Sequence, residues 1–518
     1  MEVDATTMMF VGFCIAFVTI LLTKALSWLW LEPKRAERYL RRQGLKGNSY
    51  TLFFGDIKAI STLIQKAKSK PIDINDDVTP RLVPFQHQLI RNYGKNSFFW
   101  YGPKPVVHIM DPEAIKEVLN LINDFPKPTL TPLSKFLITG LVDLDGDKWS
   151  KHRKIINPAF NLAKLKLVLP AMYHSCNQMM NEWKMLVSKK ESCMVDVWPF
   201  LNSLTGDVIS RTAFGSCYEE GKIVFQLQKE QAELTAKVFQ SVYIPGWRFV
   251  PTKLNKRMKE IDFEIRNVLS GIIQKQEAAM KTCKAPNDNL LGLLLESNQK
   301  EIEDRGHRKD VGMNTDDVIN ECKLFYFAGQ ETTSVLLNWT MVLLSRFPNW
   351  QTLAREEVIG IFGTKEPDYD GLNRLKVVTM ILYEVLRLYP PVTAITRVVR
   401  KEARVGNLTL PAGALATIPI VLVHHDSELW GSDAKEFKPE RFSEGILKAT
   451  NGQVSFLPFA WGPRICIGQN FALLEAKMAL CLILQNFSFE LSASYTHAPF
   501  TVITAQPQFG TPIILHKL

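Results

Sequence analysis

A short segment near the carboxyl terminus combines a thiol, a guanidinium and several glycines at close spacing. It reads FAWGPRICIG from Phe459 to Gly468 and contains Gly462, Arg464 and Cys466. The glycines allow the backbone to turn sharply and to pass close to a flat ligand. Arg464 can lower the pKa of the Cys466 thiol and pair with a carboxylate, and a helix that begins near Gly468 would direct its positive end at the sulfur. A cysteine without this context is usually a buried structural thiol, but a thiolate in such a loop suits an axial bond to iron.

The order of these residues resembles a known signature at every fixed position. Cytochromes P-450 bind haem with the pattern Phe-x-x-Gly-x-Arg-x-Cys-x-Gly, which the segment from Phe459 to Gly468 reproduces. The resemblance implies haem b as the cofactor and Cys466 as the proximal iron ligand, with Phe459 and Arg464 in the haem-binding loop. In this class the thiolate directs electron density toward the iron and favours O–O cleavage.

A second group of reactive side chains lies in the middle of a long predicted helix and reads AGQETT from Ala328 to Thr333. A glycine in a helix interior costs about 1 kcal/mol relative to alanine, so we expect it to have a role. Gly329 removes side-chain bulk and Thr332 can bond a carbonyl one turn back, so the helix could open locally and make room for dioxygen. An acid beside an alcohol can pass protons to reduced oxygen. Taken alone these residues could form a solvated face; the resemblance makes Glu331 the proton-relay acid and Thr332 the hydroxyl that orders dioxygen and water.

A third pattern predicts a structural ion pair. Glu384 and Arg387 are three residues apart and share a helix face. An isolated pair on a surface would contribute little. The pattern resembles the Glu-x-x-Arg helix of the same family, in which a later arginine, here Arg441, locks the pair. The resemblance implies a buried triad that holds the loop before Cys466.

A fourth pattern predicts cationic contacts to a dianionic ligand. Trp149 and Arg153 are four residues apart, so they lie on one helix face. The family uses such a Trp-x-x-x-Arg pair on a haem propionate, and Arg397 matches a further propionate contact. Each of these residues alone would more often be a surface residue, but together they suit a dianion.

One long helix must carry the acid–alcohol pair across the protein. It is predicted to run from Thr315, a candidate N-cap followed by two aspartates, to Phe347, and Pro348 ends it. At about 1.5 Å per residue it would be about 48 Å long, which is enough to cross a whole domain.

The remaining patterns predict a mainly α fold with small β-sheets, which is also the fold that the resemblance implies. Apolar runs at Phe98–Tyr101 and Val106–Met110 are typical of strands, and residues 390–425 are typical of short strands and turns. An apolar helix is expected at Phe471–Phe487. The stretch 281–315 is the most polar and is expected to hold an exposed loop.

The N-terminal segment has the composition of a membrane anchor. Met8–Leu31 contains a single charge, Lys24, and at about 1.5 Å per residue it would be about 36 Å long, enough to cross a bilayer. A cleaved signal peptide is the alternative, but it would have a shorter apolar run after basic residues, whereas Glu2 and Asp4 precede this one. We therefore expect a retained anchor.

Charge around the anchor predicts its orientation. The residues that follow it are mostly basic: Lys34, Arg35, Arg38, Arg41, Arg42 and Lys46 against Glu32 and Glu37. By the positive-inside rule the bulk of the chain stays in the cytosol, and Trp28 and Trp30 suit an interfacial belt. We expect a single-pass protein of the endoplasmic reticulum membrane, with an anchor at 1–31, a basic linker at 32–50 and a haem-thiolate catalytic domain at 51–518. Many microsomal members have a Pro-Pro-Gly-Pro hinge after the anchor; its absence here suggests that orientation is set differently.

Composition restricts the compartment and the partners. None of the eight cysteines forms a Cys-x-x-Cys pair, which disfavours zinc and a disulfide scaffold and favours a reducing compartment. The net charge of +10 suits a solvated surface, anionic lipid or an acidic protein better than nucleic acid, since no basic block is present. No Gly-x-Gly fingerprint occurs, so electrons should come from NADPH through a separate flavoprotein reductase. Lys151, Lys154 and Lys477 are candidates to receive its acidic face.

Several stretches resemble the plant subfamily that contains secologanin synthase and triterpenoid oxidases: 39–45, 146–149, 156–160 and 324–334. This implies oxidation of a bulky apolar terpenoid, a triterpenoid first, with a gibberellin-type diterpenoid or an iridoid as alternatives. The residues where the family shapes its pocket are largely apolar here: Val392, Thr393, Ala394, Ile395, Phe327 and Ala328. Two other classes stay open, a reductase-independent haem-thiolate isomerase or dehydratase and a non-enzymatic haem carrier or gas sensor. Neither would need Glu331 beside Thr332.

Overall fold

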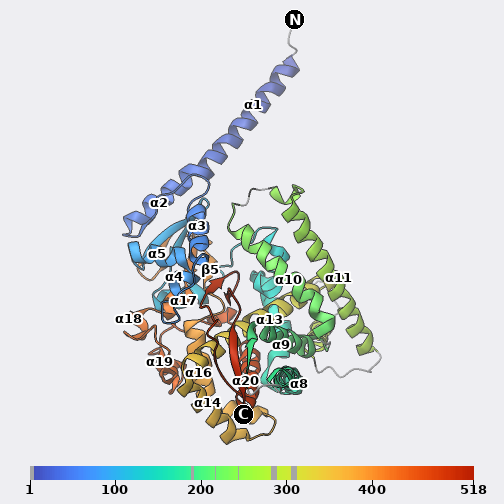
Figure 1. Cartoon of the computed structure of the whole chain (residues 1–518). Coiled ribbons are helices and arrows are strands. Elements are labelled where there is room, and N and C mark those ends of the chain that lie inside the picture. Colours follow the sequence, from blue (N-terminus) through green and yellow to red (C-terminus); the bar gives the residue numbers. More distant parts are fainter. Residues whose placement is uncertain are drawn as a thin grey trace.

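The computed structural model describes residues 5–187, 192–215, 218–242, 244, 246–281, 289–304 and 312–518. Helices dominate, and the first of them projects away from the rest of the chain (Figure 1). The helices are α1 Ala5–Leu26, α2 Glu32–Arg42, α3 Ile57–Lys68, α4 Thr79–Leu82, α5 Pro84–Tyr93, α6 Pro112–Asn120, α7 Gly146–Ile156, α8 Leu162–Val187, α9 Val197–Phe214, α10 Tyr218–Phe239, α11 Lys253–Lys281, α12 Leu290–Asp304, α13 Thr315–Arg346, α14 Pro348–Phe362, α15 Tyr369–Arg374, α16 Val377–Leu388, α17 Ile420–His424, α18 Ser427–Trp430, α19 Ile446–Ala449 and α20 Gln469–Asn486.

The strands form small sheets, so the predicted mainly α fold with small β-sheets is confirmed. They are β1 Lys46–Gly47, β2 Ser97–Tyr101, β3 Lys104–His108, β4 Ser192–Asp196, β5 Ile395–Val398, β6 Ala403–Val405, β7 Leu408–Leu410, β8 Leu415–Ile418, β9 Phe487–Leu491, β10 Pro499–Thr501, β11 Ala505–Pro507 and β12 Pro512–Lys517. One sheet has the order β1-β2-β3-β8-β5, and another has the order β4-β12-β9. The pairs β6–β7 and β10–β11 are antiparallel hairpins.

The long predicted helix is α13, and it crosses the core. Its N-cap is Asn314, one residue before the predicted Thr315, because Asn314 and Asp317 form a reciprocal capping box. It ends at Arg346, and Pro348 begins α14. Helices α9, α16 and α20 pack against it. The helix is continuous, so the local opening expected near Gly329 is not observed.

Two segments contain helices that the sequence analysis did not assign. The basic stretch after the anchor, expected as a linker, holds α2 over most of its length, and Leu40 and Leu45 are buried in the main core. In the polar stretch 281–315, residues Leu290–Asp304 form α12, because a run of leucines gives that helix an apolar face. Residues 282–288 and 305–311 of that stretch lie outside the described part of the chain.

The N-terminal helix is long and apolar enough to cross a membrane, as predicted. A helical run from Met8 to Arg42 meets this criterion, and none of its apolar window is buried inside the protein. It passes through a π-helical turn at Ser27–Leu31 into α2. Tyr50 donates a hydrogen bond to the Leu29 carbonyl at 2.7 Å. The base of the projecting helix is therefore fastened to the folded body.

Buried histidines make the stability of this fold depend on pH. Burial lowers the pKa of His108, His425 and His497 to about 4 in each case. Since the unfolded chain takes up these protons at about pH 6.5, stability is greatest above that pH and is lost below it. From about pH 7.5 to about pH 5.5 we expect the free energy of unfolding to fall by about 1.3 kcal/mol per histidine. Denaturant unfolding at both pH values measures this loss of free energy. His108→Asn should make the loss smaller by about 1.3 kcal/mol, the contribution of one histidine. An unchanged pH slope in that variant would contradict the expectation.

Candidate active site

Cys466 lies directly before α20 in a tightly closed loop. Its backbone N–H donates to the Phe459 carbonyl at 2.9 Å. Gly462 has a φ of 75°, and a Cβ there would lie 2.6 Å from the Asn120 side-chain oxygen, so only glycine fits. Gly468 is the N-cap of α20, as the sequence predicted.

The surroundings of the Cys466 sulfur act on its thiol in opposite directions. Burial raises the pKa of Cys466, whereas a hydrogen bond from the Gly468 backbone and the charge of Arg153 lower it. The residue nevertheless keeps accessible surface. The predicted influence of Arg464 on this thiol is taken by Arg153 instead, because the Arg464 guanidinium turns toward Asp145.

Trp149 and Arg153, which the sequence predicted to share one helix face, both lie on α7 and contact this loop. The Arg464 guanidinium lies over the Trp149 ring, 4.4 Å from its centroid. Arg153 donates to the Ile465 carbonyl at 2.8 Å. Arg464 also forms the predicted pair with a carboxylate, that of Asp145.

A cluster of cations lies beside the loop, with Asp143 and Asp145 as the carboxylates that act on it. Arg397 is 4% exposed, and burial and the charge of Arg464 lower its pKa to about 10. Burial and the same two arginines lower the pKa of Lys127 to about 7. The Nε atoms of Arg397 and Arg464 have no hydrogen-bond partner among the described residues. These cations lower one another's pKa, and two of the arginines have an Nε–H without an acceptor in the described part of the chain, so an anionic ligand would suit the cluster. Lys127 was not predicted, because a single lysine between two prolines carries no distinguishing signal.

The acid–alcohol pair lies where α13 regains accessible surface, since residues 327–332 are only partly buried while the helix on either side is buried. Thr332 donates to the Ala328 carbonyl one turn back at 2.7 Å, as predicted. Gly329 does not make room for a small ligand on its own side, since a Cβ there would lie 2.8 Å from the Ile209 side chain. The space that this glycine leaves is filled by α9.

Glu331 is held by a hairpin that sequence reasoning missed. Thr504 and Gln506, from the turn and second strand of β10–β11, both donate to Oε1 of Glu331. Burial raises the pKa of Glu331, and these two donors and Lys229 lower it. Burial is the largest of these effects, so the pKa of Glu331 is raised overall.

The same hairpin joins the two predicted walls of the substrate pocket. The Ala505 N–H donates to the Pro391 carbonyl at 3.1 Å, just before the stretch Val392–Ile395. The side chains of Thr504 and Gln506 reach Glu331 on α13. The segment after Pro391 and the middle of α13 are therefore close in space, as expected, although Val392 is 38% exposed.

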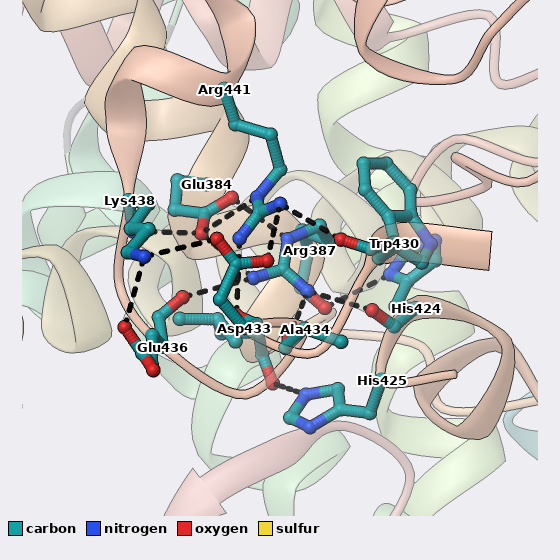
Figure 2. A network of polar contacts seen from close by, with 11 residues as sticks. Glu384, Arg387, His424, His425, Trp430, Asp433, Ala434, Glu436, Lys438 and Arg441 are labelled. Carbon is teal, nitrogen blue, oxygen red and sulfur yellow. Dashed lines mark hydrogen bonds and ion pairs between the residues drawn. The ribbon is translucent and has the colours of Figure 1, made fainter. Parts of the chain in front are cut away.

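The three predicted residues lie in one polar network (Figure 2), in which Glu384 and Arg387 are fully buried and Arg441 is partly buried. Arg387 donates to both carboxylate oxygens of Glu384, at 2.8 and 2.7 Å, and both residues are 0% exposed. Arg441 approaches Glu384 only to 3.7 Å and bonds mainly to Asp433, at 3.1 Å. The Lys438 N–H supplies a further donor to Glu384, at 2.9 Å. Asp433, which was not predicted, is therefore the main ionic partner of Arg441.

His424 connects this network to the cysteine loop. It accepts from the Leu457 N–H at Nε2, at 2.8 Å, and its Nδ1 lies 3.0 Å from the Arg387 carbonyl. Burial and the charge of Arg387 hold the pKa of His424 well below its usual value. A neutral imidazole with its hydrogen on Nδ1 satisfies both contacts. The chain at Leu457 leads into the segment that ends at Cys466, so His424 links the buried Glu384–Arg387 pair to the chain before the loop.

The three lysines that were candidates for reductase docking all have partners. Lys154 lies 2.6 Å from a carboxylate oxygen of Glu301. Lys151 and Lys477 donate to backbone carbonyls, at 2.9 and 3.2 Å. Their role in docking stays a prediction.

The surroundings of Cys466 thus fit a flat dianionic ligand with iron at its centre, and they define the class of haem-thiolate proteins. Comparison with known proteins agrees with this class. The family model described as Cytochrome P450 matches residues 79–508, and the chain belongs to the cytochrome P450 family.

Relatives of known name lie in the predicted plant subfamily. The chain is 57% identical over 509 residues to Cytochrome P450 CYP72A219 of Panax ginseng, covering 98% of each chain. It is 59% identical over 495 residues to Cytochrome P450 72A397 of Kalopanax septemlobus, covering 96% of this chain and 95% of the relative. It is 56% identical over 509 residues to the 11-oxo-beta-amyrin 30-oxidase of Glycyrrhiza uralensis, covering 97% of each. The protein is therefore a haem-thiolate monooxygenase of the kind found in plants.

Proposed function

We propose that this protein is an NADPH- and dioxygen-dependent monooxygenase of a bulky apolar plant metabolite, with a triterpenoid as the first candidate. The observation that carries the substrate class is the 56% identity to the 11-oxo-beta-amyrin 30-oxidase across 97% of both chains. The largely apolar stretch after Pro391 supports it. A gibberellin-type diterpenoid and an iridoid are the alternative substrates within the same reaction class.

Residues around the cysteine loop would hold the haem. Cys466 would bind the iron, and Arg464, Arg397, Trp149 and Arg153 would receive the propionates, because Arg464 and Arg397 belong to the cationic cluster and Trp149 and Arg153 contact the same loop. When bound, haem supplies the oxygen-activating redox chemistry of this family. Lys127 adds a further positive charge to the same cluster.

The distal residues would manage protons. Glu331 would deliver a proton from its carboxyl group, since burial raises its pKa and so favours the protonated form. The Thr332 hydroxyl, which bonds to the Ala328 carbonyl here, would orient dioxygen and water in the site. Gly329 would allow α9 to pack closely at this level. This proton path is what distinguishes a monooxygenase from a haem-thiolate isomerase.

Replacing Thr332 tests this role. A positioned proton-transfer group contributes about 10²–10⁴-fold, so we expect Thr332→Ala to lower the product formed per NADPH by at least about tenfold. NADPH consumption should continue and yield peroxide. Thr340→Ala is the matched control, because Thr340 makes the same bond to a carbonyl one turn back, at 2.7 Å, in a fully buried part of α13. Equal coupling in the two variants would contradict the role.

Membrane attachment and electron supply complete the proposal. We infer that residues 1–31 anchor the chain in the endoplasmic reticulum membrane, with the catalytic domain at 51–518 in the cytosol and a flavoprotein reductase as electron donor. The apolar helix supports the anchor. Exposed Trp247 and Phe249, 44% and 70% accessible, form a second apolar patch that suits a bilayer surface. Residues 32–50 join the anchor to the body through α2.

Product formation tests the whole proposal. The full chain would be co-expressed with a plant reductase in yeast microsomes and supplied with oleanane triterpenoids, gibberellins or iridoids. We expect an oxygenated triterpenoid that depends on NADPH, detected by mass spectrometry. A product from another substrate group would replace the triterpenoid assignment. Conversion without NADPH or reductase would instead indicate the isomerase.

A further inference from the structure

One buried carboxylate contacts two separate parts of the segment that leads to the haem site. Glu321, on α13, is 0% exposed. Its Oε1 lies 2.6 Å from Nδ1 of His152, which is also 0% exposed, and its Oε2 accepts from the Leu141 N–H at 3.0 Å. A carboxylate can only accept, so the histidine hydrogen lies on Nδ1. Glu321 therefore joins α13 both to α7 and to the turn at Gly140–Val142.

The two contacts lie at opposite ends of the segment between Gly140 and Arg153. This segment carries Asp145, Trp149 and Arg153, which with Arg464 and the loop at Cys466 form what is called the haem cradle below. After Leu141, the Leu144 carbonyl and the Asp145 carboxylate accept from Arg464, two residues before Cys466. Near the other end, His152 directly precedes Arg153, which bonds to the Ile465 carbonyl.

Gly140 shows how closely the turn approaches the carboxylate. Its φ is 62°, and a Cβ at this position would lie 2.7 Å from Oε2 of Glu321. Glycine alone permits both this backbone conformation and this approach. The turn is thus shaped around the acid.

We propose that Glu321 and His152 are positioning residues for the haem cradle. By holding both ends of the segment between Gly140 and Arg153, they set the places of Asp145, Trp149 and Arg153 relative to the cysteine loop. Neither residue touches the cofactor; both act through the segment that does. The inference rests on the proposed assignment of these groups to the haem site.

The same helix offers a matched control for a merely structural role. Lys323 is two residues from Glu321 on α13 and is 1% exposed. It pairs with Asp262 of α11 and donates to the Phe136 carbonyl at 2.9 Å. This buried ion pair links α13 to other elements, and the hydrogen bonds and ion pairs of the described residues do not join it to the segment between Gly140 and Arg153. Lys323→Met should therefore destabilise the fold without loosening the haem cradle.

The experiment measures haem retention by the full-length holoprotein. Wild type, Glu321→Gln, His152→Leu, His152→Asn and Lys323→Met would be purified in detergent, and haem transfer to excess apomyoglobin would be followed. The asparagine variant keeps a donor at the position of Nδ1, while the leucine variant removes it. Thermal unfolding of each sample gives the accompanying loss of stability. A carbon-monoxide difference spectrum of the wild type tests thiolate ligation separately.

The rate of haem release should depend on whether the contacts of Glu321 are intact and not on the overall stability of the variant. Replacing a partner of a metal-binding group typically lowers metal affinity about 10- to 100-fold. Glu321→Gln and His152→Leu should therefore release haem at least about tenfold faster than wild type. His152→Asn and Lys323→Met should release it at a rate within about twofold of wild type. Release at the wild-type rate from the first two, or equally fast release from Lys323→Met, would overturn the proposal. If Glu321→Gln does not fold, Gly140→Ala displaces the turn from the same carboxylate and should release haem faster in the same way; unchanged release there would also overturn it. A wild type without a thiolate spectrum would refute the haem assignment itself.

Discussion

Cys466→Ser removes the thiolate, and the purified protein loses the carbon-monoxide spectrum of thiolate-bound haem together with its oxidase activity. An alcohol oxygen is a much poorer donor to iron than a thiolate sulfur, and no other described cysteine lies in the loop. Because even the partners of metal ligands are worth about 10- to 100-fold, we expect activity to fall more than about 100-fold. The measurement is the difference spectrum at equal protein and haem content, followed by turnover.

Cys481→Ala is the control for this result. Cys481 lies within α20, the helix that follows Cys466, but it is 0% exposed, and burial raises the pKa of its thiol. Such a group stays protonated and packs as a small apolar side chain. We therefore expect the thiolate spectrum to persist in this variant. A thiolate spectrum in Cys466→Ser, or its loss in Cys481→Ala, would disprove the ligand assignment.

Arg387→Leu leaves the Glu384 carboxylate buried without its partner, and the free energy of unfolding falls by about 3–5 kcal/mol. The side chain lost also donates to the His424 carbonyl at 2.7 Å and to the Glu436 carbonyl at 3.1 Å. These acceptors would lie in the interior without donors. Denaturant unfolding, or the yield of folded holoprotein where unfolding is irreversible, measures the effect.

An exposed pair of the same geometry gives the comparison. Arg257 donates to both oxygens of Glu230 at 2.7 Å, yet both side chains are about 40% exposed. Water replaces the lost partner at such a site, so Arg257→Leu should change stability far less. Similar losses in the two variants would show that burial is not what makes the Glu384 pair important.

Residue spacing and capping along single elements were sufficient to predict α13 and most of the site residues. Capping residues and Pro348 delimit α13 to within one residue. Spacing along one helix predicted that Glu384 would meet Arg387 and that Trp149 and Arg153 would share a face. Glycine and cysteine at fixed spacing predicted the loop at Cys466. Each of these follows from contacts within a few residues along the chain.

Contacts between distant segments could not be predicted in the same way. The donors to Glu331 come from a hairpin about 170 residues later, and only the register of β10 and β11 brings Thr504 and Gln506 to it. The packing of Ile209 against Gly329 depends on how α9 crosses α13. No local pattern marks Lys127 as part of the cationic cluster. Such features depend on the assembled fold, which spacing along one element does not describe.

The join between the projecting helix and the body makes the enzyme sensitive to its lipid surroundings. Tyr50 is buried between Trp30 and Trp100, with ring centroids 6.2 and 4.9 Å apart, and it also bonds to Leu29. With α1 across a bilayer, these contacts would make the helix and the folded body rotate together as one rigid unit. A thicker or thinner membrane changes the tilt of such a helix. Bilayer thickness would therefore rotate the folded body, with Cys466 and Glu331 in it, relative to the lipid from which an apolar substrate arrives.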